Sequence, residues 1–525
     1  MQSGALPAAV FLFVTSPLVL AGSATWDLNP TSSDWNTALN WTPETVPNGD
    51  ADVATFGSSS ETDVSVSSTI FLQAIVFDTS ASQYTLNLGS AFLLFSSGAQ
   101  GIVNESGLVQ SVIVPTGLLS FGSGTAGDQV DFAVGGGVFG GGGILFTHSK
   151  AGSCSYVAMG PLPDQTQGGD IDFGEGGDAD RGTFEIEGSS VPGAGGGSAI
   201  FSAGASAGNG IFTIDADSVS GGYGAFGYFS YDSTGRNATF IIRGSSVADA
   251  RGGKLHFADV SDGGACRIKV FGNGSLDISW HMPPGTTVGS IEGDGDIFLG
   301  GIDSLYGADS LIVGSNNLST VFHGTLNDGG DGGGTGGKLT KVGRGQLILK
   351  QANEYTGGTT ISAGSLIAAN VTGSATGSGP VQVSGGTLGG IGTVSGSVSV
   401  GSSTSSGTLR PGIRKKLGQL NILGNLTFAA LGGCDISLNS ATRSAGVIAA
   451  NGVMIETGAS ASISDLGTAA LPSGTVFTIV SNTGTSPIQG VFANLPDNAT
   501  ISVGSNSYLV SYEGGDGNDL TLTVQ

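Results

Sequence analysis

The sequence predicts an all-β fold, a parallel β-solenoid that forms a single elongated body. The first observation is a Phe that recurs every 27 or 28 residues, followed each time by a second apolar residue 10 or 11 positions later. The second is an alternation of apolar and polar residues around these marks, as in Ile171–Phe173 and Phe212–Ile214, which is typical of strands with one buried face. The third is a content of 95 Gly in 525 residues, with hardly any helix signals. Stacked coils with an internal Phe ladder account for all three.

At the N-terminus, residues 1–24 are strongly apolar and end in small residues, so that cleavage after Ala21, Ser23 or Ala24 is plausible. We expect a secretory signal peptide, although Met1–Gly4 carries no Lys or Arg. A buried first strand is the weaker alternative, because two prolines interrupt the run. No other segment approaches the roughly 20 apolar residues that a membrane span needs.

The repeat region is expected to cover residues 119–300, because Phe121 and Phe132 form one more, irregular pair of marks before the regular run. We expect about three short strands in each unit, separated by turns rich in Gly, Asp, Ser and Asn. The regular marks are Phe146, Phe173, Phe201, Phe229 and Phe257, then Tyr156, Phe184, Phe212, Phe240 and Ile268. A third mark follows them at Ser190-Val191, Ser218-Val219, Ser246-Val247 and, one residue late, Ser275-Leu276.

The chain is acidic, with a formal net charge of −24 and 17 Lys and Arg residues. Nucleic acids and anionic membranes need basic patches, so we expect neither as a partner. A solvated acidic surface that keeps a β-rich protein soluble is the favoured interpretation. A surface that binds calcium or faces a polysaccharide is the alternative.

Three cysteines, Cys154, Cys266 and Cys434, are too few for a disulfide framework in a chain of this length. Cys154 and Cys266 occupy the same coil position four units apart, which corresponds to nearly 20 Å at about 4.8 Å per coil. That distance is far beyond the roughly 6 Å between the Cα atoms of a disulfide. We expect reduced, buried thiols.

The sequence predicts no catalytic, cofactor-binding or metal-binding residue, and no enzyme. The four histidines, His148, His256, His281 and His323, share no metal-ligand spacing. The Asp pairs Asp170/Asp172 and Asp294/Asp296 are assigned to Gly-rich turns, where Asp is common for conformational reasons. The expected outward neighbours of the Phe ladder contain no adjacent pair of carboxylates: Leu145, Asp172, Ile200, Tyr228 and His256.

Near the C-terminus, Gly514–Asp519 matches the start of the calcium-binding nonapeptide GGxGxDxUx. The apolar position of that pattern is held by Thr521. A single imperfect copy supplies too few oxygen ligands, since such rolls share calcium between consecutive turns. We therefore expect a tight turn before the last strand.

Residues 339–366 resemble the autotransporter-associated β-strand repeat, which reads Leu-x-Lys-x-Gly-x-Gly-Thr-Leu-x-Leu, then Asn-Thr-Tyr-x-Gly-x-Thr, then Gly-x-Leu. The matching segments are Leu339–Leu349, Asn353–Thr359 and Gly364–Leu366, with Gln346 and Glu354 at two positions where Thr is usual. The opening, with Trp26, Trp35 and Trp41, is similar to the head of such proteins, and these rings could cover the exposed first coil. The resemblance implies a right-handed β-helix exported to or beyond the surface of a Gram-negative-type bacterium.

The domain prediction is a signal peptide over 1–24, an N-terminal cap and first coils over 25–118, the repeat region over 119–300, and a C-terminal β-helix over 301–525. We expect a secreted or cell-surface structural or adhesive protein, similar to an autotransporter passenger without its own translocator barrel. A carbohydrate-active β-helix enzyme, either a polysaccharide lyase or a glycoside hydrolase, is the alternative. The expected partner is an extracellular polysaccharide or another cell-surface molecule, and no cofactor is expected.

Overall fold

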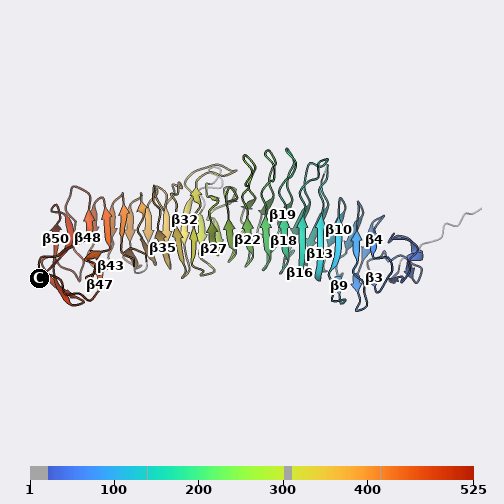
Figure 1. The fold of residues 1–525 in the computed structure, drawn as a ribbon, viewed down its shortest axis with the longest axis horizontal. Coiled ribbons are helices and arrows are strands. Elements are labelled where there is room, and N and C mark those ends of the chain that lie inside the picture. The colour runs from blue at the N-terminus through green and yellow to red at the C-terminus, as the bar shows by residue number, and fades with distance from the viewer. Residues whose placement is uncertain (1–21, 139, 301–309, 414–415) are drawn as a thin grey trace, which may run out of the picture.

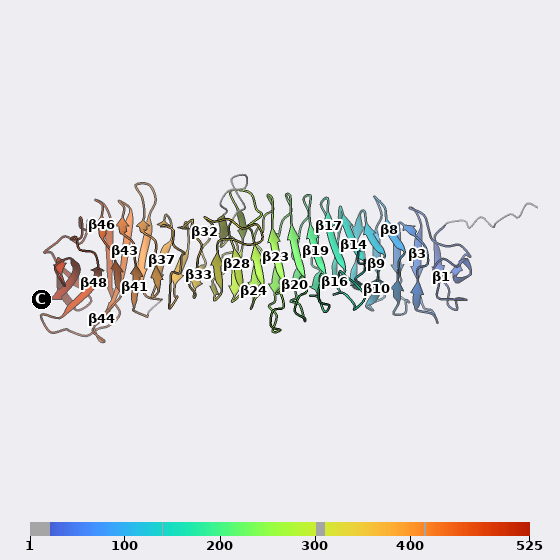
Figure 2. The same ribbon diagram turned by 90° about the horizontal axis from the view of Figure 1, so that it is seen from above.

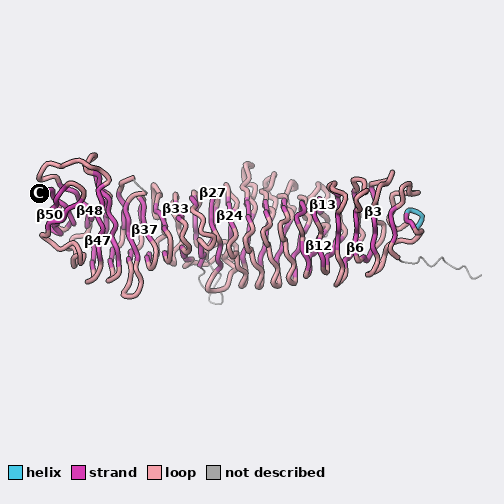
Figure 3. The backbone as a smooth tube through the Cα atoms, turned by 90° about the horizontal axis from the view of Figure 1, so that it is seen from below, coloured by secondary structure: helices cyan, strands magenta, loops and turns pink. Residues whose placement is uncertain are grey.

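The computed structural model describes residues 22–138, 140–300, 310–413 and 416–525. The chain winds into one long rod of stacked coils, with the N-terminal and C-terminal regions at opposite ends (Figures 1 and 2). Figure 3 shows strands alternating with loops along the whole rod. The all-β, parallel β-solenoid prediction is therefore confirmed. The predicted signal peptide falls on residues that, up to residue 21, lie outside the described part of the chain.

One face of the rod is an 11-stranded parallel sheet, here called the ladder sheet. Its register places each Phe mark beside the next, as in Phe173 with Phe201 and Phe201 with Phe229. Apolar side chains alternate inward along each strand, so the Phe column lies inside the rod. The strands are β5 (Ile70–Leu72), β8 (Phe92–Phe95), β11 (Leu118–Phe121), β14 (Gly143–Thr147), β17 (Asp170–Gly174), β19 (Ser198–Phe201), β21 (Phe226–Phe229), β23 (Lys254–Phe257), β25 (Ser275–Asp277), β28 (Asp296–Phe298) and β31 (Thr325–Asn327).

A second parallel sheet, the anchor sheet, carries the second marks and runs along almost the whole rod. In the repeat region its Phe rings meet the ladder rings edge to face, for example Phe212 against Phe201 at 5.6 Å between centroids. Its strands are β4 (Asp63–Ser65), β7 (Thr85–Asn87), β10 (Gln110–Val114), β13 (Asp128–Val134), β16 (Ser153–Ala158), β18 (Thr183–Ile186), β20 (Ile211–Ile214), β22 (Thr239–Ile242), β24 (Arg267–Val270), β27 (Ser290–Gly293), β30 (Thr320–Phe322), β33 (Gln346–Leu349), β35 (Ser365–Ala368), β37 (Thr387–Gly390), β40 (Gly407–Pro411), β43 (Gly432–Asn439) and β47 (Ser460–Asp465).

The third side of the coil changes along the rod. It consists of short strands near the N-terminus, from β3 (Val53–Phe56) to β15 (Ser149–Lys150), and then of single bridges through Asp178, Ser206 and Thr234. Further on it becomes an eight-stranded sheet. That sheet contains β26 (Thr286–Val288), β29 (Ser310–Val313), β32 (Lys338–Lys341), β34 (Thr359–Ile361), β36 (Val381–Val383), β39 (Val398–Val400), β42 (Leu426–Phe428) and β46 (Val453–Ile455).

Three details of the predicted repeat are wrong. Each 28-residue unit holds two strands and a bridge, and Ser190-Val191 and its equivalents lie in loops where a third strand was expected. Ser275-Leu276 instead belongs to β25 and pairs with Lys254-Leu255 of the ladder sheet. The stack of rings also begins before residue 119, because Phe95 lies on Phe121 with 4.9 Å between centroids.

Both ends of the core are covered. At the N-terminus, Trp26, Trp35 and Trp41 pack on one another and on Phe56 of β3, beside the short helix η1 (Ala38–Asn40) and β1 (Ala24–Trp26). At the C-terminus, β48 (Val476–Asn482), β49 (Thr500–Val503), β50 (Asn506–Gly514) and β51 (Asp519–Val524) pair antiparallel and depart from the parallel stacking. Gly514–Asp519 joins β50 to β51, which confirms the predicted turn.

The three cysteines are free and buried, as predicted. Within the described residues, no helix has the length and apolar character needed to cross a membrane.

Candidate functional site

The most prominent surface feature of the repeat region is a stack of four loops of equal length, here called the loop fin. They span residues 159–169, 187–197, 215–225 and 243–253, and each connects the anchor sheet to the next ladder strand. Long loops project from one side of the green part of the rod in Figure 1. Backbone hydrogen bonds join neighbouring loops, for example from Gly193 N to Gly221 O at 2.9 Å and from Gly196 N to Gly224 O at 3.1 Å. The fin is therefore ordered by the same stacking that orders the coils.

Glycine is required inside the fin because the loops approach so closely. A Cβ on Gly196 would lie 2.8 Å from the backbone of the adjacent loop. The buried carboxylate of Asp217 adds a side-chain contact between loops, since it accepts hydrogen bonds from Ser189 N at 2.6 Å and Gly224 N at 3.0 Å. Burial raises the pKa of the Asp217 carboxyl, and the hydrogen bonds that it accepts from backbone amides only partly offset this rise.

The fin ends abruptly, and a groove of about 580 Å³ lies where it ends. After 243–253, the next connection of the same kind is only residues 271–274. The last two long loops form one wall, the outer face of the ladder sheet forms the floor, and Asp331 contributes the other wall. The lining residues are Tyr223, Ala225, Phe226, Asp249, Ala250, Arg251, Gly252, Lys254, His256, Asn273, Ser275, Asp296, Phe298 and Asp331.

Two columns of outward side chains on the ladder sheet form the floor of the groove and its edge. The columns arise because the parallel register places equivalent residues of neighbouring strands side by side. One column runs through Phe226, Lys254, Ser275 and Asp296. The other runs through Tyr228, His256, Asp277 and Phe298. His256 and Asp277 are therefore neighbours on adjacent strands.

Residues 328–337, which connect β31 to β32, dock on this sheet and bring Asp331 to the groove. Asp277 accepts a hydrogen bond from Asp331 N at 2.8 Å, and Ser279 accepts one from Gly332 N at 2.8 Å. Gly330 has a φ of +110°, and a Cβ there would lie 2.7 Å from the Asp277 carboxylate. The Asp331 carboxylate then receives the Lys254 ammonium at 2.7 and 2.8 Å.

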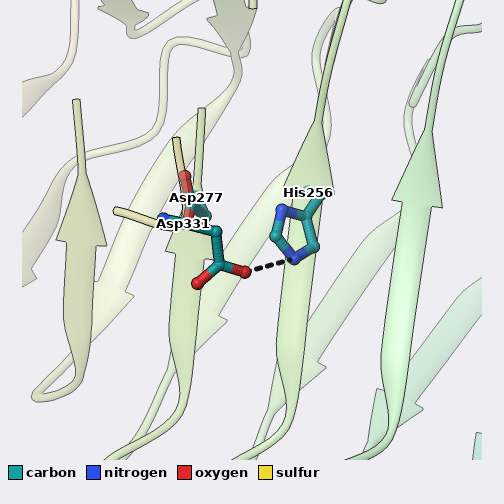
Figure 4. Close-up of side chains that lie close together, drawn as sticks. All are labelled: His256, Asp277 and Asp331. Carbon is teal, nitrogen blue, oxygen red and sulfur yellow. Dashed lines mark hydrogen bonds and ion pairs between the residues drawn. The ribbon is translucent and has the colours of Figure 1, made fainter. Parts of the chain in front are cut away.

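His256, Asp277 and Asp331 form a compact cluster (Figure 4). Each offers one potential metal-ligand atom, and these atoms lie within 4.8 Å of one another. His256 Nε2 is 3.6 Å from Asp331 Oδ2, and its buried Nδ1 has no hydrogen-bond partner among the described residues. The cluster could hold a divalent cation only in competition with Lys254, which already neutralises Asp331. The prediction that the chain has no metal site stays a prediction.

The charges in the cluster are set by burial and by Lys254. Burial lowers the pKa of His256 despite the carboxylates beside it. Burial alone would raise the pKa of Asp331, but the hydrogen bond and charge of Lys254 outweigh it and keep that pKa below its usual value. The arrangement is a neutral imidazole beside an ion pair, which holds residues 328–337 against the sheet.

Of the four histidines, only His256 lies in this cluster. His148 and His323 are exposed on other coils, and His281 is buried with its ring nitrogens 2.6 Å from the carbonyl oxygens of Met282 and Ser261. The predicted outward column from Leu145 to His256 is confirmed by the strand register.

The assignment of Asp170 and Asp172 to a turn is wrong, because both lie on the outer face of β17. Asp170 accepts a hydrogen bond from Ser198 Oγ at 2.6 Å. The pKa of Asp172 is raised to about 6, first by burial and then by the charge of Asp170. In the register of the sheet, Asp172 lies between Leu145 and Ile200 and Asp170 lies between Gly143 and Ser198, and neither carboxylate lines the groove.

The residues that carry the family resemblance lie inside the rod. Lys341 is buried and its ammonium donates to the carbonyl oxygens of Val342 and Gly343, while burial lowers its pKa to about 8. Asn353 connects neighbouring coils by accepting from Leu326 N and donating to Ala375 O. The Tyr355 hydroxyl bonds to Thr359. The motif thus specifies coil geometry and lies apart from the groove.

Comparison with known proteins agrees with this motif. Residues 339–368 match the Passenger-associated-transport-repeat family, so the chain carries a repeat of the autotransporter passenger type, as predicted. The Haemophilus influenzae Hap adhesin is a solved structure to which the chain is similar, at 11% sequence identity and a TM-score of 0.31. The match covers 90% of this chain and 59% of that one, so this chain spans less than two thirds of its length. No curated protein matches the sequence.

Proposed function

We propose that the protein is a secreted or cell-surface rod that adheres to other surfaces and performs no catalysis. The observation that carries this proposal is the continuous stacked core, which extends from the Trp cluster to the antiparallel strands near the C-terminus. Such a body holds laterally projecting loops in fixed positions along its length, and loops on a rigid scaffold are where proteins commonly place binding residues. The passenger-type repeat at 339–368 supports export to the outside of a Gram-negative-type cell.

The chemistry of the groove favours binding over hydrolysis. A glycosidase needs one carboxyl group that holds a proton and a second one that is free to act on the sugar. Here Asp331 is paired with Lys254, and Asp277 accepts backbone hydrogen bonds from Ser279 and Asp331. These two carboxylates are thus engaged in holding residues 328–337 in place, while Asp296 accepts a hydrogen bond from Thr325 Oγ1 at 2.6 Å and Asp249 lies in the loop wall.

Adhesion is tested with inert beads that carry the purified chain, presented to bacterial cells and to animal and plant cell layers. Beads that carry the urea-unfolded chain are the matched control. We expect retention on at least one surface that requires the folded chain. Equal retention of both kinds of bead on every surface would refute the adhesive function.

The absence of catalysis is tested separately by incubating the chain with bacterial and plant polysaccharides and measuring reducing and unsaturated sugar ends. We expect no release above the buffer control. Release that is lost in an Asp331→Asn variant would instead support the carbohydrate-active alternative.

A further inference from the structure

We propose that the groove at the end of the loop fin binds a segment of a neutral polysaccharide, recognised through its hydroxyl groups and its apolar ring faces. This proposal rests on the adhesive function proposed above and names a ligand class for one site. The volume of about 580 Å³ falls within the range of roughly 300–1,000 Å³ that is usual for small-ligand sites, which corresponds to a few sugar rings at most.

Aromatic side chains give the groove the apolar faces that a sugar ring needs. Tyr223, in the loop that spans residues 215–225, is 61% exposed. The Arg251 guanidinium carbon lies 5.0 Å from the centre of its ring and fixes the ring by a cation–π contact. Phe226 and Phe298 are partly exposed on the floor. An exposed but oriented Tyr contributes contact area at a low entropic cost, as in antibody binding sites.

The polar groups of the groove include both donors and acceptors. Arg251, Lys254 and Asn273 supply N–H groups, and Asp249 and Asp296 supply carboxylates. A hydroxyl group both donates and accepts hydrogen bonds, so this mixture suits a polyhydroxylated chain. An apolar ligand would leave the remaining hydrogen-bonding capacity of these groups unused, at a cost in affinity.

Charge favours a neutral polysaccharide over an acidic one. Among the described residues that line the groove, the basic side chains besides His256 are Arg251 and Lys254, and Lys254 is already paired with Asp331. The same set of lining residues carries three carboxylates, and the whole chain has a net charge of −24. A polyuronate or sulfated glycan would be repelled both locally and at long range.

The groove is preorganised in the free protein. Asn273 donates to Ala250 O at 2.7 Å and accepts from Ser245 N at 2.8 Å, which ties the short connection 271–274 to the last long loop. Asp331 and Lys254 fix the opposite wall. A site whose side chains are held in place before binding loses less entropy on association.

The test measures binding of the full chain to labelled cello-, xylo-, manno- and malto-hexaose as neutral probes, and to hexamers of galacturonate and mannuronate as acidic probes. The variant is Tyr223→Ala. The matched control is Tyr231→Ala, because Tyr231 is equally exposed, at 64%, but lies outside the groove. We expect at least one neutral probe to bind, about tenfold weaker binding in Tyr223→Ala, and no change in Tyr231→Ala. Far-UV circular dichroism verifies that both variants fold.

Two outcomes would overturn the proposal: no neutral probe binds, whether or not an acidic probe does, or Tyr223→Ala binds as tightly as the unchanged chain. The bead assay separates this failure from a failure of the adhesive function. Beads that carry Tyr223→Ala and still adhere as well as the unchanged chain would leave adhesion intact while excluding the groove as its site.

Discussion

The internal Phe ladder makes a quantitative prediction for Phe201→Ala. The Phe201 ring is fully buried and lies 4.5 Å from the Phe173 ring and 4.4 Å from the Phe229 ring, with both pairs within 3° of parallel. It also meets Phe212 edge to face. Truncating a buried Phe costs about 3–5 kcal/mol, because transfer energy is lost and a cavity remains. Since stacked neighbours on both sides prevent collapse, we expect about 4 kcal/mol.

The assay is equilibrium unfolding in urea, combined with native-state hydrogen exchange. The matched control is Phe92→Ala, because Phe92 lies on the outer face of β8 and is 46% exposed. We expect less than about 1 kcal/mol for the control. In Phe201→Ala, exchange should accelerate most in the adjacent coils and fade with distance, since each coil contacts only its neighbours. A loss no larger than that of Phe92→Ala would refute the ladder as the main source of stability.

Three further outcomes are expected. Burial, aided by the charge of a neighbouring carboxylate, raises the pKa of Asp172 from 3.8 to about 6, so the folded state binds this proton more tightly than the unfolded state. Urea unfolding should therefore show a free energy of unfolding that falls by about 3 kcal/mol as the pH rises from roughly 4 to 6. The Asp172→Asn variant should lack this fall. Burial raises the pKa of the Cys154 thiol to about 12 and acts likewise on the other two cysteines, so a thiol reagent should label none in the folded chain and all three after unfolding. Asp217→Ala leaves buried amides of the loop fin without an acceptor, and we expect about 1–3 kcal/mol of destabilisation and faster proteolysis within the fin, less so for Asp217→Asn.

The interior of the rod could be predicted from the sequence because its buried aromatic side chains recur at a nearly constant sequence interval. Phe173, Phe201 and Phe229 occur 28 residues apart, and a parallel register converts that interval into stacking without any further information. The first part of the stack was missed because Phe95 has no second apolar mark: Glu105 and Ser106 stand 10 and 11 positions after it, whereas Phe132 stands 11 positions after Phe121.

The cluster at the groove could not be predicted in the same way. Asp277 pairs with His256 because the coil shortens from 28 to 21 residues between Lys254 and Ser275. Alignment by the usual interval instead assigned Ser275-Leu276 as the next third mark after Ser246-Val247, one residue late. Asp331 reaches Asp277 from 54 positions further along the chain, through a loop that docks by hydrogen bonds from its backbone amides to the side chains of Asp277 and Ser279. Any residue except Pro can donate such a bond from its backbone, so the loop's own sequence shows no sign of these contacts apart from Gly330.

The place of the groove follows from how a solenoid tolerates change. A stacked interior restricts variation, because one misplaced side chain disturbs the coils on both sides. The connections between strands face solvent and can change length at little cost. The long connection 243–253 is followed by the much shorter connection 271–274, which leaves the outer face of the ladder sheet uncovered beside the long loop. The outward side chains of the sheet then form the floor of the groove, and the long loop forms its wall. A site of this kind requires no rearrangement of the core, so differences in loop length between adjacent coils are the natural places to search for binding sites on such a rod.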